Sequence, residues 1–306
     1  MKLNRAAVRT AILLALLQPA LPPALMAHRP VEHARGHAPH PALWKLSKGP
    51  STIYLFGTIH ALPPHFEWET PQLRAAFAQS DRLVLEAVID QDPAKSAAAL
   101  MRIGMPASPL PPLADRIAPK YRPALAGMIA KSAVPAATLN AMKTWAAGML
   151  LFGTTVQSLG VSSADGVEER LKAEFRATGK PVEGLETLEQ QLGFFDTLTE
   201  PQQRDFLESV VDQKGNDAAD FGKMLGAWSH GDEKGISASF DKDMKKSDVL
   251  RTVLIARRDQ HWADAIVSRL GQPGTQFVAV GAGHLVGPDS VQAMLAKLGY
   301  KAERVE

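Results

Sequence analysis

Two histidines in matching surroundings are the residues of this chain best suited to chemistry. His60 follows Gly57, and His284 follows Gly281; each Gly-x-x-His comes after a short apolar run with the pattern of a buried strand. A histidine at the exit of a buried parallel strand lies where open α/β sheets place ligands. Imidazole binds divalent metals and serves as a general base. The two motifs therefore predict one shared site, although a hydrogen-bonded structural histidine is the alternative for each.

Glu86 is a carboxylate inside an otherwise apolar segment, residues 83–89. Burying a carboxylate costs several kcal/mol unless it is paired or coordinates a metal. One alternative is a strand of alternating faces with Glu86 on the solvated one. Val84 and Val88 share that face, which argues against full solvation. We therefore expect Glu86 to have a functional role.

Glu186 and Arg258 are two further charged candidates. Glu186 falls just past a predicted strand, at the start of the next helix. It is either part of the site or a carboxylate favoured there by the helix dipole. Arg258 falls between Leu254 and Trp262 in the apolar stripe of a predicted helix. A guanidinium there needs a carboxylate or anionic partner, so both a structural salt bridge and a clamp for an oxyanion or substrate carboxylate are open.

Several common kinds of site are excluded by what the sequence lacks. It has no Gly-x-Ser-x-Gly elbow, no phosphate loop with Gly-Lys-Ser/Thr and no His-Glu-x-x-His. It also has no cysteine. Any metal ligands must then be His, Asp or Glu, and a cysteine nucleophile or lipid attachment through an N-terminal cysteine is ruled out.

The first 27 residues have the features of a secretory signal peptide. Lys2, Arg5 and Arg9 precede a short apolar run, and Ala27 offers a small residue for cleavage. The run is too short and too interrupted by proline for a membrane span, which needs roughly 20 residues; an uncleaved N-terminal anchor is the alternative. Cleavage would remove three positive charges from the formal net charge of +2, leaving −1. We therefore expect an exported protein, periplasmic or secreted, with no nucleic acid partner and no stable membrane span after signal removal.

Residues 28–42 have the composition of a linker rich in histidine and proline. A His-rich tract can bind metal. The simpler interpretation is a flexible polar tether without fixed ligand geometry.

The periodicity of residues 43–306 predicts an α/β fold. Strands are expected at 51–59, 82–89, 181–185, 276–282 and 300–305. Helices are expected at 71–79 behind the cap Thr70, from Ser162 or Ser163 to Gly179, at 248–270 and at 288–298. The strands gather at the two ends of the chain. We predict a mixed sheet built from N- and C-terminal βαβ-like segments, with a large all-helical insertion at about 93–270 between them.

Eight short motifs spread over residues 43 to 305 resemble the TraB/GumN family, which is related to the Tiki metalloproteases. The motifs are Leu43-Trp-Lys-Leu; Tyr54-Leu-Phe-Gly-Thr-Ile-His60; Val84-Leu-Glu86; Gly166 to Leu171 after Asp165; Gly184-Leu-Glu-Thr187 with Gln190-Gln191; Trp228 with Gly231-Asp232; Arg258-Asp259-x-x-Trp262; and Val280-Gly-Ala-Gly-His-Leu-Val-Gly287. This chain departs from the resemblance at Asp259, where Asn is usual, and at Ala164-Asp165-Gly166, where Gly-Leu-Asp is usual.

The resemblance implies an α/β domain with a helical insertion and, for the Tiki-like members, peptidase chemistry that depends on a divalent metal. Our leading hypothesis is an exported metal-dependent hydrolase, a peptidase acting on a peptide or other small or extended substrate. His60, Glu86 and His284 would hold a Mn, Co or Zn ion, Glu186 would be the general base, and Arg258 would steady the developing oxyanion.

Two other hypotheses use the same residues. In the first, a periplasmic binding or regulatory protein uses the cleft for a peptide, a polysaccharide fragment or a tetrapyrrole without turnover. In the second, a metal-free ester hydrolase uses one histidine as its base. The metal's identity, the substrate and the oligomeric state are not specified by the sequence.

Overall fold

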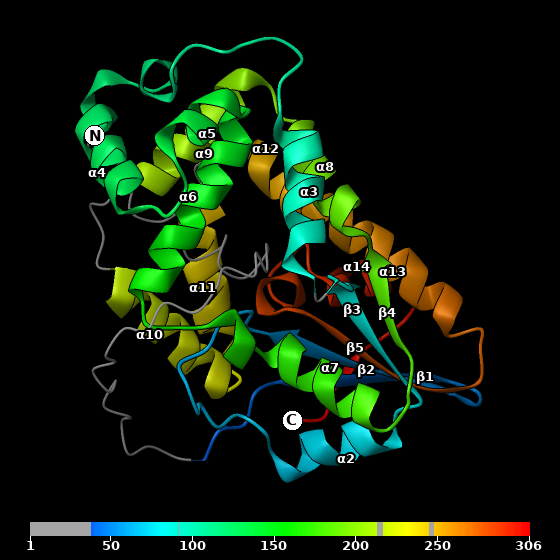
Figure 1. Cartoon of the computed structure of the whole chain (residues 1–306). Coiled ribbons are helices and arrows are strands. Elements are labelled where there is room, and N and C mark those ends of the chain that lie inside the picture. The colour runs from blue at the N-terminus through cyan, green and yellow to red at the C-terminus, as the bar shows by residue number, and fades with distance from the viewer. Residues whose placement is uncertain (1–37, 91, 213–216, 245–247) are drawn as a thin grey trace.

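The computed structural model describes residues 38–306 apart from 91, 213–216 and 245–247 (Figure 1). The predicted signal peptide, residues 1–27, and most of the predicted linker lie outside the described residues. Both therefore stay predictions. Among the residues that are described, no helix has the length and apolar character needed to cross a membrane.

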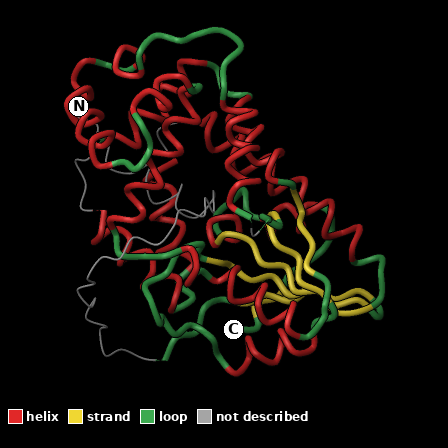
Figure 2. The backbone as a smooth tube through the Cα atoms, viewed as in Figure 1, coloured by secondary structure: helices red, strands yellow, loops and turns green. Residues whose placement is uncertain are grey.

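In the described part of the chain, the strands form one six-stranded mixed sheet in the order β4-β3-β5-β2-β1-β6. Figure 2 shows these strands in yellow. Strands β2, β3, β4 and β5 run parallel, while β1 pairs antiparallel with β2 and β6. The strands are β1 (Leu43–Lys48), β2 (Ser51–Thr58), β3 (Arg82–Ala87), β4 (Val182–Glu186), β5 (Gly274–Gly281) and β6 (Glu303–Arg304). Strand β5, from the end of the chain, lies between β2 and β3 from its beginning, which confirms the predicted α/β class and its mixed sheet.

Alternating side chains of the strands build two separate hydrophobic layers. Tyr54 and Phe56 of β2 pack on one face with α2 and α7, whereas Ile53 and Leu55 pack on the other face with α13 and α14 (Figure 1). Strand side chains alternate between faces with a period of two. Glu86 has the same parity as Val84 of β3, a member of the second layer, so it faces α13.

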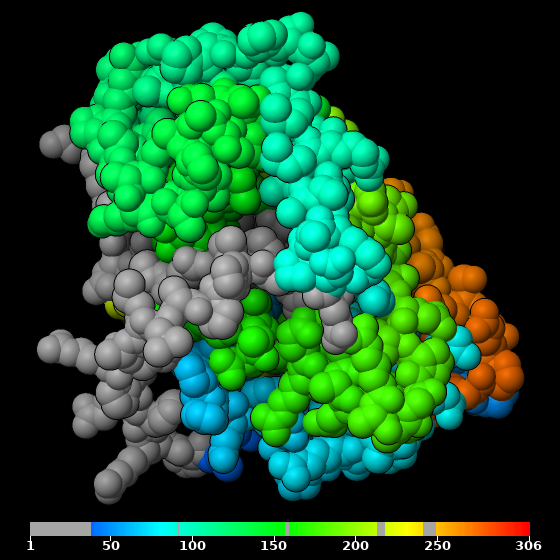
Figure 3. Space-filling view, in the orientation of Figure 1, coloured from blue at the N-terminus to red at the C-terminus, as the bar shows by residue number. Residues whose placement is uncertain are grey.

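The helices fill the stretch between the strand-rich ends, and β4 interrupts that stretch to join the sheet. The α-helices are α2 (Pro71–Gln79), α3 (Pro93–Gly104), α4 (Arg122–Lys131), α5 (Ala136–Ala141), α6 (Thr144–Ser158), α7 (Val167–Ala177), α8 (Leu188–Asp196), α9 (Glu200–Val211), α10 (Asp217–Ser229), α11 (Glu233–Met244), α12 (Asp248–Arg251), α13 (Arg257–Arg269) and α14 (Val291–Lys297). Short 3₁₀ turns are η1 (Leu113–Arg116), η2 (Pro119–Tyr121), η3 (Ser163–Asp165) and η5 (Ala282–Leu285). In the space-filling view, the helices from α3 to α6, coloured cyan to green, form the upper part of the molecule, and α2 and α7 lie below them (Figure 3).

The predicted helix 288–298 begins only at Val291 (α14), and the predicted strand 300–305 is observed only over Glu303–Arg304 (β6). Two further helix boundaries differ from the prediction. Ser162 caps the 3₁₀ turn η3 rather than α7, which begins only after Gly166. The predicted helix 248–270 is also not uniform, because residues Thr252–Ala256 (η4) form a π-helical segment between α12 and α13. Neither the 3₁₀ turn η3 nor the π-helical segment η4 has a residue periodicity that can be recognised in the sequence. Both lie next to predicted site residues.

Candidate functional site

The predicted site residues lie at the carboxyl ends of the four parallel strands. Glu86 is on β3, Glu186 ends β4, His60 follows β2, and His284 follows β5 in η5. Carboxyl ends of neighbouring parallel strands meet at one edge of the sheet, where open α/β sheets bind ligands. Arg258 reaches this edge from α13. The fold thus places all five predicted residues at one edge.

Arg258 joins the two predicted glutamates. Its side chain is fully buried, and its Nη2 donates to Glu86 Oε2 at 2.7 Å and to Glu186 Oε2 at 2.9 Å. Its Nε donates to both oxygens of Glu186, at 3.1 and 3.2 Å. Burial disfavours the charge, but the two carboxylates outweigh it and raise the pKa of Arg258 above its ordinary value. The expected carboxylate partner of Arg258 is therefore a pair of carboxylates.

The π-helical segment before α13 supplies Arg258 with another acceptor. Its Nη1 donates to the carbonyl of Leu254, within that segment, at 3.3 Å. The guanidinium also lies over the ring of Trp262, 4.6 Å from its centroid. Single π-turns inside α-helices occur frequently at functional sites. Here the turn directs a buried cation to the edge of the sheet.

Glu86 uses both of its oxygens. Oε1 accepts from the backbone N–H of Gly281 at 2.6 Å, while Oε2 accepts from Arg258. Burial raises the pKa of Glu86, while Arg258 and His60 act in the opposite direction. The expectation that this carboxylate is buried and paired is met, since 6% of Glu86 is exposed.

His284 is held on both sides of its ring. Nδ1 lies 2.6 Å from Asp259 Oδ1, and Nε2 lies 3.3 Å from Arg258 Nη1. A guanidinium can only donate, so Nε2 must accept and the ring proton must be on Nδ1, where Asp259 accepts it. Burial, with the nearby charges of Arg258 and His60, lowers the pKa of His284 well below its ordinary value. His284 is therefore a neutral imidazole with its Nε2 lone pair toward the cluster.

His60 has a carboxylate partner of its own. Nδ1 lies 2.5 Å from Glu168 Oε1, and Thr58 Oγ1 donates to the same oxygen. The other ring nitrogen, Nε2, is buried and has no hydrogen-bond partner among the described residues. Burial lowers the pKa of His60, but the charge of Glu168 and its hydrogen bond, with a contribution from Glu86, raise it to about 9.

The donor types of this site fit a divalent metal, and one buried atom points to a missing partner. Two imidazoles and a carboxylate suit Zn, Mn or Co, and buried nitrogens without a partner are rare in folded proteins. Glu86 and His284 are each engaged by Arg258, however, so an ion would share these ligands with the guanidinium. Among the described residues, no group of three or more His, Asp or Glu side chains is arranged to hold a metal as it stands.

Glu168 and Asp259 were not among the sequence-predicted site residues. Glu168 follows Gly166 by two positions on α7 and is 6% exposed, and Asp259 is fully buried. A signal for Asp259 was present, since it replaces the usual Asn beside Arg258. No feature of the surrounding sequence indicated a functional role for Glu168, because acidic residues are common in the first turn of a helix.

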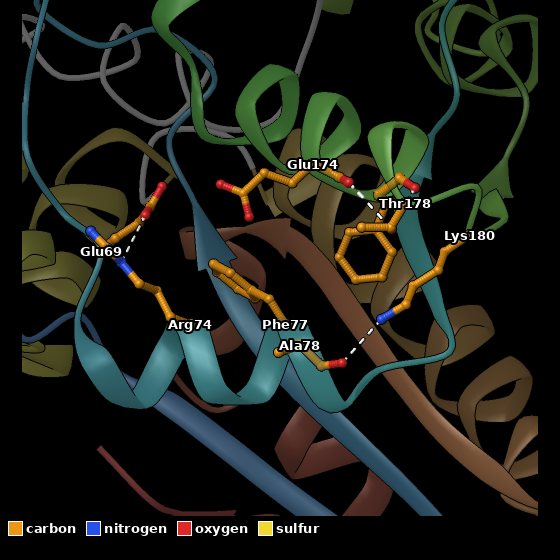
Figure 4. A pocket seen from close by; sticks show the side chains of 8 residues that line it. Glu69, Arg74, Phe77, Ala78, Glu174, Thr178 and Lys180 are labelled. Carbon is orange, nitrogen blue, oxygen red and sulfur yellow. Dashed lines mark hydrogen bonds and ion pairs between the residues drawn. The ribbon is translucent and has the colours of Figure 1, made fainter.

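A surface pocket of about 380 Å³ lies between α2 and α7 and contains none of the predicted site residues (Figure 4). Its lining residues are Glu69, Arg74, Phe77, Ala78, Glu174, Phe175, Thr178 and Lys180. Arg74 pairs with Glu69 at 3.2 Å, and Lys180 donates to the carbonyl of Ala78 at 3.0 Å. Its polar groups largely satisfy one another, so we place the candidate site at the sheet edge instead.

Comparisons with known proteins give one family and two relatives. The chain is 24% identical over 259 residues to "Uncharacterized protein YbaP" of Escherichia coli (strain K12), covering 85% of this chain and 93% of that protein. The protein of the same name in Shigella flexneri matches with the same identity and coverage. No solved structure gives a significant match. The model of the TraB/PrgY/gumN family matches residues 42–304, nearly the whole described part of the chain, and the chain therefore belongs to that family.

Proposed function

We propose that this protein is a hydrolase that depends on a divalent metal and acts on peptides, with its site at the carboxyl ends of β2, β3, β4 and β5. The observation that carries the proposal is the buried Nε2 of His60, which lies next to a cluster of paired charges and has no partner in the part of the chain that the structure describes. His60, Glu86 and His284 would hold the ion. Such an ion would supply Lewis acidity and lower the pKa of a bound water.

The roles of Glu186 and Arg258 follow from their contacts. Glu186 is our candidate general base, and it accepts from Arg258 and, at 2.9 Å, from Trp262 Nε1. Arg258 would steady a developing oxyanion. Its N–H groups are directed at protein acceptors, so Arg258 must exchange one of these contacts for the substrate oxygen.

Metal analysis of the purified protein tests the proposal. We expect about one divalent ion per chain, and His60→Ala or His284→Ala should abolish its retention. His261→Ala is the matched control, because His261 is exposed on α13, near Arg258 in sequence. Unchanged metal content in both site variants would refute the shared ion.

A peptide-library assay with and without chelator then separates turnover from binding. The proposal expects hydrolysis that stops in EDTA and returns when Mn²⁺, Co²⁺ or Zn²⁺ is added. Retention of a peptide, saccharide or tetrapyrrole without product would favour the alternative, a binding or regulatory protein. Hydrolysis that persists in EDTA would favour a metal-free hydrolase with a histidine base.

We also propose that the protein is exported. The support is the basic and apolar character of residues 1–27. Expression of the full chain in a bacterial host, followed by fractionation and N-terminal sequencing, should give a mature protein that starts near residue 28 outside the cytoplasm. A full-length cytoplasmic protein would contradict the proposal.

A further inference from the structure

We propose that Glu168 and Asp259 are positioning residues, one for each histidine. Each accepts the Nδ1 proton of its histidine and so turns Nε2 toward the site. The inference rests on the proposed function only where it gives Nε2 of each histidine the role of a metal ligand. The orientation of the two rings stands on the contacts themselves.

Glu168 is fixed against the His60 segment by two hydrogen bonds and by the close approach of the backbone at Gly166. Thr58 Oγ1 donates to Glu168 Oε1, and the backbone N–H of Val167 donates to the carbonyl of Ile59 at 3.1 Å. At Gly166, an added Cβ would lie 2.2 Å from the carbonyl oxygen of His60. The first turn of α7 and the end of β2 therefore interlock, and this sets the position of the carboxylate relative to the ring.

Asp259 does the same for His284 from α13. Its Oδ1 lies 2.6 Å from His284 Nδ1, and the ring packs on Trp262 with centroids 4.5 Å apart. Arg258, the residue before Asp259, donates to the opposite nitrogen at 3.3 Å. Two consecutive residues of one helix thus hold both edges of the imidazole and leave a single possible tautomer.

Packing alone gives no reason for these two carboxylates. Glu168 Oε2 and Asp259 Oδ2 are buried and have no hydrogen-bond partner in the described part of the chain. A buried polar atom without a partner costs about 1–3 kcal/mol. An acidic side chain retained at that cost is typical of histidines whose other nitrogen binds a metal or moves a proton, because the carboxylate fixes the tautomer and raises the basicity of the ring.

The test compares Glu168→Gln and Asp259→Asn with Glu174→Gln and Asp264→Asn, in the full chain. Each of the four substitutions keeps the side-chain shape and replaces a carboxyl group with an amide. The control residues lie on the same two helices, α7 and α13, and are exposed. Long-range ¹H–¹⁵N NMR spectra of the histidine side chains, recorded from about pH 6 to about pH 10, sample the neutral forms.

We expect the neutral form of both wild-type rings to carry its proton on Nδ1. In Glu168→Gln the Nε2–H form should gain population at His60 only. In Asp259→Asn the His284 proton should stay on Nδ1, because Arg258 still donates to Nε2, but the Nδ1–H proton signal should move upfield, because an amide oxygen is a weaker acceptor than a carboxylate. The controls should match the wild type. A wild-type ring that rests as the Nε2–H tautomer, an unchanged His60 tautomer in Glu168→Gln, or an unchanged His284 Nδ1–H signal in Asp259→Asn would overturn the inference.

Calorimetric titration with Mn²⁺, Co²⁺ or Zn²⁺ alone gives a second readout. Each positioning variant should bind the metal about 10–100-fold more weakly than the wild type, whereas the controls should not. Equal affinities would count against the inference. If the wild type binds no metal, the proposed function fails, and the NMR arm still decides whether Glu168 and Asp259 position the rings.

Discussion

Arg258, Glu86 and Glu186 form a buried ion cluster at the sheet edge, and the cluster stabilises the fold only when all three residues are present. Arg258 is fully buried between Glu86 and Glu186, away from solvent. Breaking such a pair by deleting one member is far more costly than losing an exposed pair. At the scale of the residue, the site is therefore also a stability element.

Glu86→Ala should lower the free energy of unfolding by about 3–5 kcal/mol, because it leaves a buried guanidinium with one carboxylate fewer. Urea denaturation of the metal-free protein measures the loss. Glu189→Ala is the control, since Glu189 is half exposed in its pair with Arg102 and its loss should cost about 0–1 kcal/mol. Similar losses for the two variants would show that the cluster does not stabilise the fold.

The pKa of His60 predicts a loss of stability in mild base. The folded-state pKa of about 9 lies above the ordinary histidine pKa of 6.5, so the folded protein binds this proton more tightly. Protonation of His60 contributes up to about 3 kcal/mol to the free energy of unfolding. This stabilisation is fully present below pH 6.5 and is lost as the pH rises through about 9. Urea midpoints at about pH 6 and pH 9.5 in EDTA measure it. His60→Gln should show a smaller fall than the wild type, and an equal fall would assign the effect to other groups.

At the scale of the element, the start of α7 and the end of β2 act as one unit. Val167 and Glu168 bond to the residues around His60, and Gly166 permits the close approach. The π-helical segment before α13 has a comparable role, because it gives Arg258 a backbone acceptor at Leu254. The positions of the charged residues are thus decided at element ends rather than within regular helices.

Gly166→Ala should destabilise the protein by about 1–3 kcal/mol, because the new Cβ would meet the carbonyl oxygen of His60 at 2.2 Å. It should also weaken metal binding through the displaced His60. Gly193→Ala is the matched control: Gly193 lies inside α8 with nothing within 4 Å of an added Cβ, and there alanine should stabilise by up to about 1 kcal/mol. Denaturation and metal titration of both variants check the prediction. An unchanged free energy of unfolding in Gly166→Ala would mean that the start of α7 and the end of β2 are not closely packed at this position.

At the scale of the whole molecule, one hydrophobic cluster connects the sheet to the helices between its halves. It contains Phe56 and Phe277 of the sheet together with Trp145 of α6 and Phe206 of α9. A shared core of this kind favours one cooperative unit over a sheet domain and a separate helical domain.

Unfolding should therefore show a single transition for residues 43–306. Leu55→Ala in the sheet and Leu139→Ala in α5 both empty fully buried positions, and each should shift that same transition by about 2–5 kcal/mol. Tryptophan fluorescence and far-ultraviolet circular dichroism should report coincident curves. Two transitions, each moved by only one of the variants, would show that the helical part unfolds by itself.

Local sequence patterns were sufficient to predict the main elements and the unusual charges. Apolar runs and the cap Thr70 predicted β2, β3, α2 and β5 within a few residues, because these signals are local and repeat with the period of the element. Glu86 and Arg258 stood out because a charge in an apolar pattern needs a partner. The placement of His60 and His284 at one sheet edge followed from their positions after strands.

Which charges come into contact depends on the three-dimensional arrangement of distant segments. Arg258 and Glu86 are 172 residues apart, and Thr58 and Glu168 are 110 residues apart. Strand order and parallel register set these distances in space, and neither is encoded in the residues on either side of a contact. The carboxylates behind the two histidines, Glu168 and Asp259, were missed for this physical reason: a hydrogen bond between distant segments leaves no periodic trace in either one.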